Sequence, residues 1–196
     1  MNEDLVSMIV AVDRYAQKNL SQSRYEHSVR VAEMARELCE RFSVDPNLGF
    51  LAGIGHDICK AESDVTLLSL TIADGIPLSD IERAKPALLH GRAAAVLLSR
   101  DFGVTDECVL NAVRCHTFGD AGLCDLGKIV FVADKIEPGR TGIDPAFREG
   151  ILQADLVTMT RMVLEDNIRY LEARGKLVSP ASLMMLKDLN AKGERR

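Results

Sequence analysis

The chain has 196 residues, of which 47% are hydrophobic, 27% are charged and only 5% are aromatic, with no tryptophan. This length fits one domain with a substantial core, and the aliphatic composition favours a helical fold. The formal net charge of -5 argues against nucleic-acid binding through a broad basic face but leaves room for a small phosphorylated ligand.

Apolar residues recur at helical spacing through the first third of the chain. They predict a helix over residues 5–20 and a second helix over about 24–42, preceded by N-cap residues at 21–23. A third helix is predicted to begin at Pro46 behind the cap Asp45 and to run into His56 and Asp57. Gly53 and Gly55 weaken this helix by about 1 kcal/mol each relative to alanine, which indicates that another backbone packs closely against them.

Helical patterns continue to the C-terminus, and no strand alternation interrupts them. We expect helices at 63–73, 78–85, 91–98, 104–115, 123–136, 145–153, 156–173 and 181–189, with a frayed charged tail at 192–196. The sequence therefore predicts an all-α bundle formed as a single domain, residues 1–196. Its core would span about 21–174, with helices at 1–20 and 176–196 packed on it.

The N-terminus and the apolar runs indicate the location of the protein. Met1–Leu5 is acidic rather than basic, which is unlike a signal peptide, and no apolar run approaches the roughly 20 residues that span a bilayer. We therefore expect a cytoplasmic protein with no membrane partner.

The sulfur-containing residues suggest structural positions. The cysteines are odd in number and lack C-x-x-C spacing, which predicts free buried thiols at Cys39, Cys59, Cys108, Cys115 and Cys124. A zinc site from Cys115, His116 and Cys124 is an alternative with irregular spacing. Four methionines are predicted to lie in the core, and some of them could line a homodimer contact: Met159, Met162, Met184 and Met185.

Six imidazole and carboxylate groups lie on similar positions at the apolar edges of these helices. Each alone is explained by a hydrogen-bonded core residue, but together they are explained more economically by one metal centre. Such ligands suit iron, manganese, zinc or related divalent ions, and a bridging carboxylate would allow two ions to act on one phosphate. The six residues are His27, His56, Asp57, His90, His116 and Asp134.

The chain resembles the HD-domain superfamily of metal-dependent phosphohydrolases in the order of His27, His56-Asp57 and Asp134. Over about residues 24–171 it is similar to the YqeK-type branch, the bacterial symmetrical bis(5'-nucleosyl)-tetraphosphatases, which cleave diadenosine tetraphosphate into two ADP. The segments that carry this resemblance are RYEHSVRVA at 24–32, LAGIGHDICK at 51–60, His116-Thr117 and ADKIEPGR at 133–140.

The resemblance implies a role for each matched residue. His27, His56, Asp57 and Asp134 would bind the first ion, with iron the first choice and manganese, cobalt or zinc as alternatives. His90 and His116 would bind a second ion or contact phosphate. Asp57 would bridge the ions, a metal-bound hydroxide would attack the phosphorus, and Lys60 would act beside Asp57. The substrate-facing residues would be Arg24, Lys60, Thr117 and Arg140, whose cations can neutralise a polyphosphate.

The sequence departs from the family pattern at three positions and leaves other functions open. Phe118 stands where a small or hydroxyl residue is usual, Asp120 where a basic residue is usual and Ala94 where glycine is frequent, which puts the fine phosphate contacts and the nucleotide preference in question. The alternatives are an HD-type nucleotidase or phosphodiesterase and a non-catalytic nucleotide-binding regulatory module. The isolated cations also have simpler explanations as solvated or ion-paired surface charges.

Overall fold

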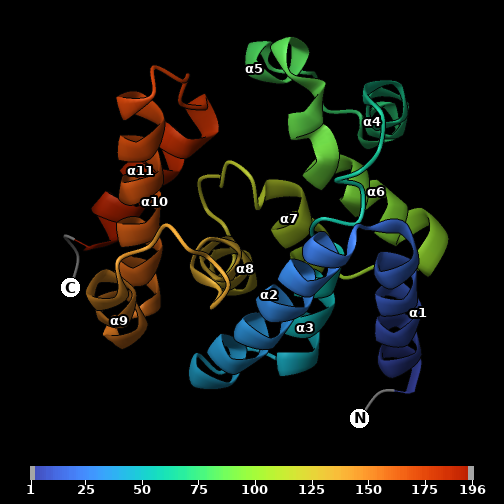
Figure 1. Ribbon diagram of the computed structural model, residues 1–196, viewed down its shortest axis with the longest axis horizontal. Helices are drawn as coiled ribbons and strands as arrows, with labels where there is room; N and C mark the ends of the chain where they lie inside the picture. Colours follow the sequence, from blue (N-terminus) through green and yellow to red (C-terminus); the bar gives the residue numbers. More distant parts are fainter. Residues whose placement is uncertain (1–2, 194–196) are drawn as a thin grey trace.

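The computed structural model describes residues 3–193, and helices joined by turns make up this part of the chain without any strand (Figure 1). The predicted all-α class is confirmed. The helices are α1 Glu3–Asn19, α2 Gln22–Arg41, α3 Pro46–Gly55, α4 Asp64–Thr71, α5 Asp80–Ala84, α6 His90–Phe102, α7 Glu107–Cys115, α8 Asp125–Ile136, α9 Pro145–Gln153, α10 Leu156–Ala173 and α11 Pro180–Gly193, with 3-10 turns η1 Ile72–Asp74 and η2 Pro86–Leu89.

Several helix ends differ from the prediction. The helix α3 ends at Gly55 rather than continuing through Asp57, because the chain closes into tight turns in which Ile58 N donates to Gly55 O and Lys60 N donates to Asp57 O. His90 opens α6 instead of preceding it. The last helix extends beyond the predicted 181–189 to Gly193, and residues 194–196 of the predicted charged tail lie outside the described part.

Side-chain caps fix many of the helix starts. Ser21 Oγ accepts from Arg24 N at the start of α2, and Asp45 Oδ1 accepts from Asn47 N at 2.8 Å before Pro46 opens α3. These side chains satisfy backbone N–H groups that have no partner within the helix. The predicted caps at 21 and 45 are confirmed.

Close packing of α2 against α3 explains one of the two glycines. A Cβ at Gly53 would lie 2.5 Å from the Ala32 Cα, so only glycine lets the two backbones approach this closely. A Cβ at Gly55 would instead meet the Leu98 side chain at 3.0 Å. The predicted backbone contact is therefore confirmed at Gly53 and wrong at Gly55, which faces a side chain of α6.

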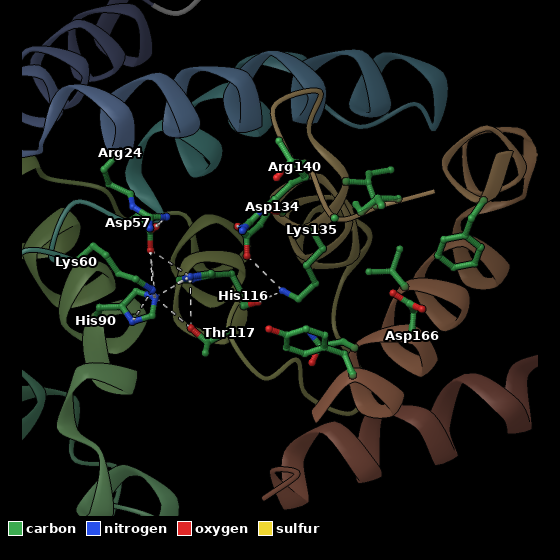
Figure 2. Close-up of a pocket in the computed structure, with 18 residues that line it drawn as sticks. Arg24, Asp57, Lys60, His90, His116, Thr117, Asp134, Lys135, Arg140 and Asp166 are labelled. Atoms are coloured by element: carbon green, nitrogen blue, oxygen red, sulfur yellow. Dashed lines mark hydrogen bonds and ion pairs between the residues drawn. The ribbon is translucent and has the colours of Figure 1, made fainter. Parts of the chain in front are cut away.

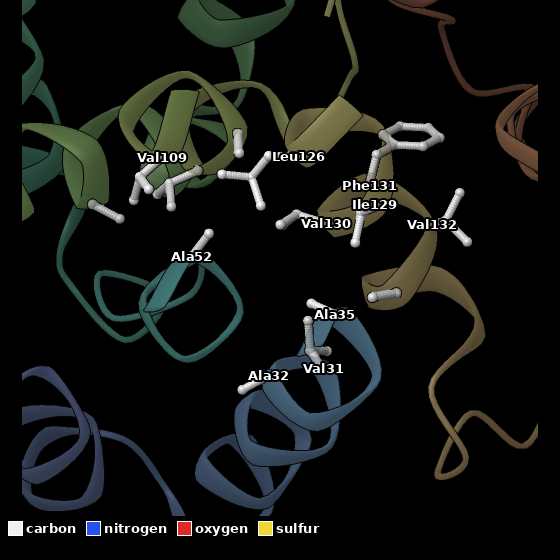
Figure 3. Packing of buried hydrophobic residues seen from close by; sticks show 14 of the residues in the cluster. Val31, Ala32, Ala35, Ala52, Val109, Leu126, Ile129, Val130, Phe131 and Val132 are labelled. Atoms are coloured by element: carbon white, nitrogen blue, oxygen red, sulfur yellow. The ribbon is translucent and has the colours of Figure 1, made fainter. Parts of the chain in front are cut away.

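The helix α8 runs through the centre of the bundle and packs on α2, α3, α7 and α10. Its residues from Leu126 to Asp134 are buried, and the small residues Ala35 of α2 and Ala52 of α3 approach it (Figure 3). This packing holds the start of α2, the turn after α3 and the end of α8 in fixed relation. Four of the polar residues predicted from the sequence lie at these ends: His27, His56, Asp57 and Asp134.

The cysteines are free, but they are not uniformly buried. Cys39 and Cys59 are buried, Cys115 and Cys124 are half-buried, and Cys108 is exposed. The prediction of five buried thiols is therefore wrong for three of them. Cys108 lies in the first turn of α7, where its side chain turns away from the core formed by the rest of that helix.

The four methionines divide in the same way. Met159 and Met185 are fully buried and confirm the core prediction, whereas Met162 is half-buried and Met184 is 52% exposed. The difference at α11 arises because only one face of that helix contacts α10. In the described part of the chain, the helices are too short or too polar to cross a lipid bilayer.

Candidate metal centre

Five segments far apart in the sequence bring the six predicted ligands to one place. His27 comes from the first turns of α2, His56 and Asp57 from the turn after α3, and His90 from the start of α6. His116 follows α7 and Asp134 lies near the end of α8. As whole residues, the four histidines are at most 5% exposed, and the two aspartates at most 9%. Figure 2 shows Asp57, His90, His116 and Asp134 facing the same space.

In each of the four histidines, the Nδ1 atom faces a hydrogen-bond acceptor and the Nε2 atom faces the cluster. The Nδ1 atoms of His56, His90 and His116 lie 2.6, 2.8 and 2.7 Å from the carbonyl oxygens of the residues three positions before them. The Nδ1 of His27 lies 3.1 Å from Glu137 Oε1. Because these oxygens can only accept, each Nδ1 must donate its proton, which leaves the lone pair of each Nε2 directed into the cluster. This is the arrangement of metal-binding imidazoles.

Two overlapping groups of ligand atoms could each hold an ion. One consists of His27, His56 and Asp134, and the other of His56, Asp57 and His116; the atoms of each group lie within 4.8 Å of one another. The Nε2 of His90 lies 3.1 Å from Asp57 Oδ1 and 3.0 Å from His116 Nε2. The structure therefore brings together all six residues predicted as ligands.

Polar atoms without hydrogen bonds mark the centre of the cluster. His27 Nε2, His56 Nε2 and Asp57 Oδ1 are buried and lack a hydrogen-bond partner in the described structure. A buried polar group without a partner costs about 1–3 kcal/mol. An ion that accepts electron pairs from two imidazoles and a carboxylate would satisfy all three atoms, so the residues present fit a divalent metal.

The electrostatics keep the ligands in the forms that bind metals. Burial lowers the pKa of the His56 imidazole from 6.5 to about 3, so this ring is neutral near pH 7. Burial alone would raise the pKa of Asp57, but the neighbouring imidazoles, His56 foremost, hold it well below its usual value. At Asp134 the ammonium of Lys135 likewise outweighs burial, and the pKa lies well below the usual range.

Glu137 supports the cluster from behind, a role that the sequence reasoning missed. It is 1% exposed and accepts from His27 Nδ1, from Arg30 Nε at 2.5 Å and from Gly139 N at 2.5 Å. A Cβ at Gly139 would collide with the Arg30 guanidinium, so a larger residue there would displace that guanidinium from its position against Glu137. The Glu-Pro-Gly-Arg segment at 137–140 carries part of the family resemblance, but the sequence offers no partner that would assign a role to its glutamate.

Four cations surround a cavity of about 500 Å³ that opens onto the cluster, and we call it the main cavity (Figure 2). Arg24 Nη1 lies 2.9 Å from Asp57 Oδ2, Lys60 Nζ lies 3.0 Å from His90 Nε2, and Arg140 Nη2 lies 2.7 Å from Asp134 Oδ1. Lys135, which was not predicted, donates to the His116 carbonyl at 2.8 Å. Burial lowers the pKa of Lys60 and of Lys135.

The predicted substrate-facing residues all line the main cavity. Thr117 Oγ1 lies 3.3 Å from both His90 Nε2 and His116 Nε2, at the edge of the cluster. The opposite wall was not predicted and comes from Phe147 of α9 and from Asp166, Asn167 and Tyr170 of α10. These residues lack a local sequence signal, because they have the ordinary helical spacing of a surface-facing helix.

The alternative zinc site at Cys115, His116 and Cys124 is not supported by the geometry. His116 directs Nδ1 to the Val113 carbonyl and Nε2 to the cluster around Asp57. Over the described residues, neither cysteine belongs to a group of three or more ligand atoms close enough to share an ion. His116 therefore belongs to the histidine cluster.

Comparison with known proteins defines first the class and then the branch. Residues 24–139 match the HD domain, a metal-dependent domain whose ligand order fits the cluster described above. A crystal structure described as a predicted HD superfamily hydrolase involved in NAD metabolism, from Clostridium acetobutylicum, superposes with a TM-score of 0.85 at 28% sequence identity, covering 93% of this chain and 96% of that one. The fold is that of an HD-domain hydrolase.

Curated relatives narrow this class. Symmetrical bis(5'-nucleosyl)-tetraphosphatases from Staphylococcus aureus and Bacillus subtilis are 34% and 31% identical to this chain. The alignments cover 76% and 85% of this chain, and 79% and 89% of those enzymes. The chain therefore belongs to the HD-domain family, in the branch of the symmetrical bis(5'-nucleosyl)-tetraphosphatases.

Proposed function

We propose that this protein is a metal-dependent hydrolase of dinucleoside polyphosphates that cleaves diadenosine tetraphosphate symmetrically into two ADP. The observation that carries the proposal is the set of unpaired buried Nε2 and carboxylate atoms beside a cavity lined by four cations. The family relationship supports the same substrate class. Water would add across the central P–O–P bond, so that each half leaves as a nucleoside diphosphate.

For the metal we propose His27, His56, Asp57 and Asp134 as ligands of a first ion. His90 and His116 would bind a second ion or contact phosphate, and Asp57 would bridge the ions, because its Oδ2 lies 3.5 Å from His56 Nε2 and its Oδ1 lies 3.1 Å from His90 Nε2. Imidazole and carboxylate donors suit iron, our first candidate, as well as manganese, cobalt and zinc. Bound at such a site, a divalent ion lowers the pKa of water and offsets charge on phosphate oxygens.

The cations of the main cavity would hold the polyphosphate. Arg24, Lys60 and Arg140 contact the carboxylates or imidazoles of the cluster on one side and line the cavity on the other. A phosphate placed there would accept charge-assisted hydrogen bonds from them. Lys60 is the catalytic candidate among them, because its ammonium lies 3.6 Å from Asp57 and can offset charge that develops on the reacting phosphate.

The decisive experiment combines metal analysis with identification of products. Wild-type protein loaded with Fe²⁺, Mn²⁺ or Co²⁺ should convert diadenosine tetraphosphate to ADP alone, and Asp57→Ala should lose both bound metal and turnover. Production of ATP and AMP would refute symmetrical cleavage. Unchanged turnover by Asp57→Ala would refute the metal mechanism.

Two features of the wider organisation also remain predictions. We propose a single domain, because α1 packs on α3 and α6 while α11 packs on α10, so that both terminal helices are joined to the central bundle. We also propose a cytoplasmic location. A homodimer is a further prediction, which light scattering on the purified protein would test. The substrate proposed above is a small molecule, and the net charge of -5 remains the argument against a nucleic-acid partner.

A further inference from the structure

A second cavity of about 350 Å³ adjoins the main cavity. Four segments form its walls: the stretch from Ile76 to Leu88, Arg92 of α6, residues 114–120 at the end of α7 and in the turn after it, and the start of α11. Thr117 lines both cavities, and its hydroxyl lies 3.3 Å from the histidines of the cluster. The second cavity therefore begins where the proposed phosphate site ends.

The walls of the second cavity are mainly apolar and partly open. Phe118 and Leu88 are half-buried, while Met184 and Ile76 keep 52% and 45% of their surface exposed. A hydrogen bond of 2.7 Å from Ser182 Oγ to the Phe118 carbonyl joins α11 to the turn. An apolar recess with fixed walls is suited to the flat face of an aromatic base.

Two arginines reach this cavity, and they differ in their partners. Arg92 is fully engaged by Asp74, Glu82 and the Ile76 carbonyl. Arg114, in contrast, has a buried Nε without a hydrogen-bond partner in the described structure. A buried guanidinium nitrogen of this kind is costly unless a ligand accepts from it. Arg114 therefore brings a guanidinium with one unpartnered nitrogen to a wall that also carries the polar side chains of Ser79 and Asp120.

The chemistry of the proposed substrate requires two nucleoside positions. Symmetrical cleavage breaks the central bond, so an ADP unit must extend from the cluster on each side. The main cavity provides one position, at the wall formed by Phe147, Asn167 and Tyr170. On the basis of the proposed function, we propose that the second cavity binds the other nucleoside, with its base between Phe118 and Met184 and with Arg114 as hydrogen-bond donor.

The test compares two substrates on the metal-loaded enzyme. Diadenosine tetraphosphate should occupy both nucleoside positions, whereas adenosine 5'-tetraphosphate, which has one nucleoside, can react with the second cavity empty. Met184→Ala removes part of the apolar wall and should lower the ratio of kcat/KM for the dinucleotide over the mononucleotide about fivefold. Arg114→Gln should lower the same ratio about tenfold.

Leu183→Ala is the matched control, because Leu183 is also 52% exposed on α11 but does not line the second cavity. It should keep the wild-type ratio. Binding of a methylene-bridged, non-hydrolysable dinucleotide by calorimetry should weaken by the same factor in Met184→Ala. If Met184→Ala and Arg114→Gln keep the wild-type ratio of kcat/KM values and the wild-type affinity for the dinucleotide analogue, the inference is overturned. A wild-type enzyme inactive on both substrates would instead refute the proposed function.

Discussion

Replacement of Glu137 by glutamine tests whether the cluster is built for a metal. Glutamine keeps the shape of the side chain but removes the charge that faces His27 Nδ1 at 3.1 Å and Arg30 Nε at 2.5 Å. Loss of such an outer partner typically costs 10–100-fold in metal affinity. We therefore expect Glu137→Gln to bind the ion about 10–100-fold more weakly, equivalent to about 1.4–2.8 kcal/mol.

The assay is competition for the metal against a chelator of known affinity, followed by metal analysis of the protein. Glu33→Gln is the matched control. Glu33 lies on the surface of α2, where it forms an ion pair of 2.8 Å with Arg36, remote from the proposed ligands. The control should bind metal like the wild type. Equal affinity in Glu137→Gln and Glu33→Gln would refute the role assigned to Glu137.

Three further predictions follow from individual contacts. Gly53→Ala should destabilise the protein by about 1–3 kcal/mol in urea unfolding, because its Cβ would meet Ala32. Gly150→Ala in α9 is the control and should not be destabilising, because a Cβ there has nothing within 4 Å. Equal losses of unfolding free energy in the two variants would contradict the packing argument. In metal-free protein, the free energy of unfolding should fall as the pH drops from about 6.5 towards 3, by about 1.4 kcal/mol per pH unit for His56. The reason is that His56 binds a proton in the unfolded chain over this range but stays neutral when buried in the folded protein. A free energy of unfolding that does not change over this range would exclude a neutral buried ring. Lys60→Gln should lower kcat/KM about 10–100-fold while metal content is unchanged, and a loss of metal would instead assign Lys60 to the integrity of the cluster.

The sequence alone singled out six candidate ligands, because the four histidines lie at the apolar edges of predicted helices and Asp57 and Asp134 interrupt apolar helical patterns. The resemblance to the HD-domain superfamily assigned them to a metal. An ionisable side chain inside such a pattern must be paired or bind a ligand, whichever fold the chain adopts. His27, Asp57 and Asp134 were therefore identifiable before any contact was known. The glycine at position 53 was identifiable for a similar reason, since it has a conformational cost that only close packing offsets.

The surroundings of the cluster depended on the tertiary structure. Glu137 and Lys135 acquire their roles from His27 on α2 and from the carbonyl of His116 after α7, which no local pattern connects to α8. The wall around Tyr170 and the recess beside Phe118 likewise form between elements distant in the chain.

What the sequence by itself determined is the helical class, the helix periodicity and the set of candidate metal ligands, because burial and backbone preference act on each residue locally. The tertiary structure decided which Nε2 atoms converge, which cations face the cavity and where two nucleosides could lie. These properties depend on how α2, α3, α7 and α10 pack around α8. Side-chain packing across such interfaces brings together residues that are far apart in sequence. The pattern of residues along one segment does not predict these contacts.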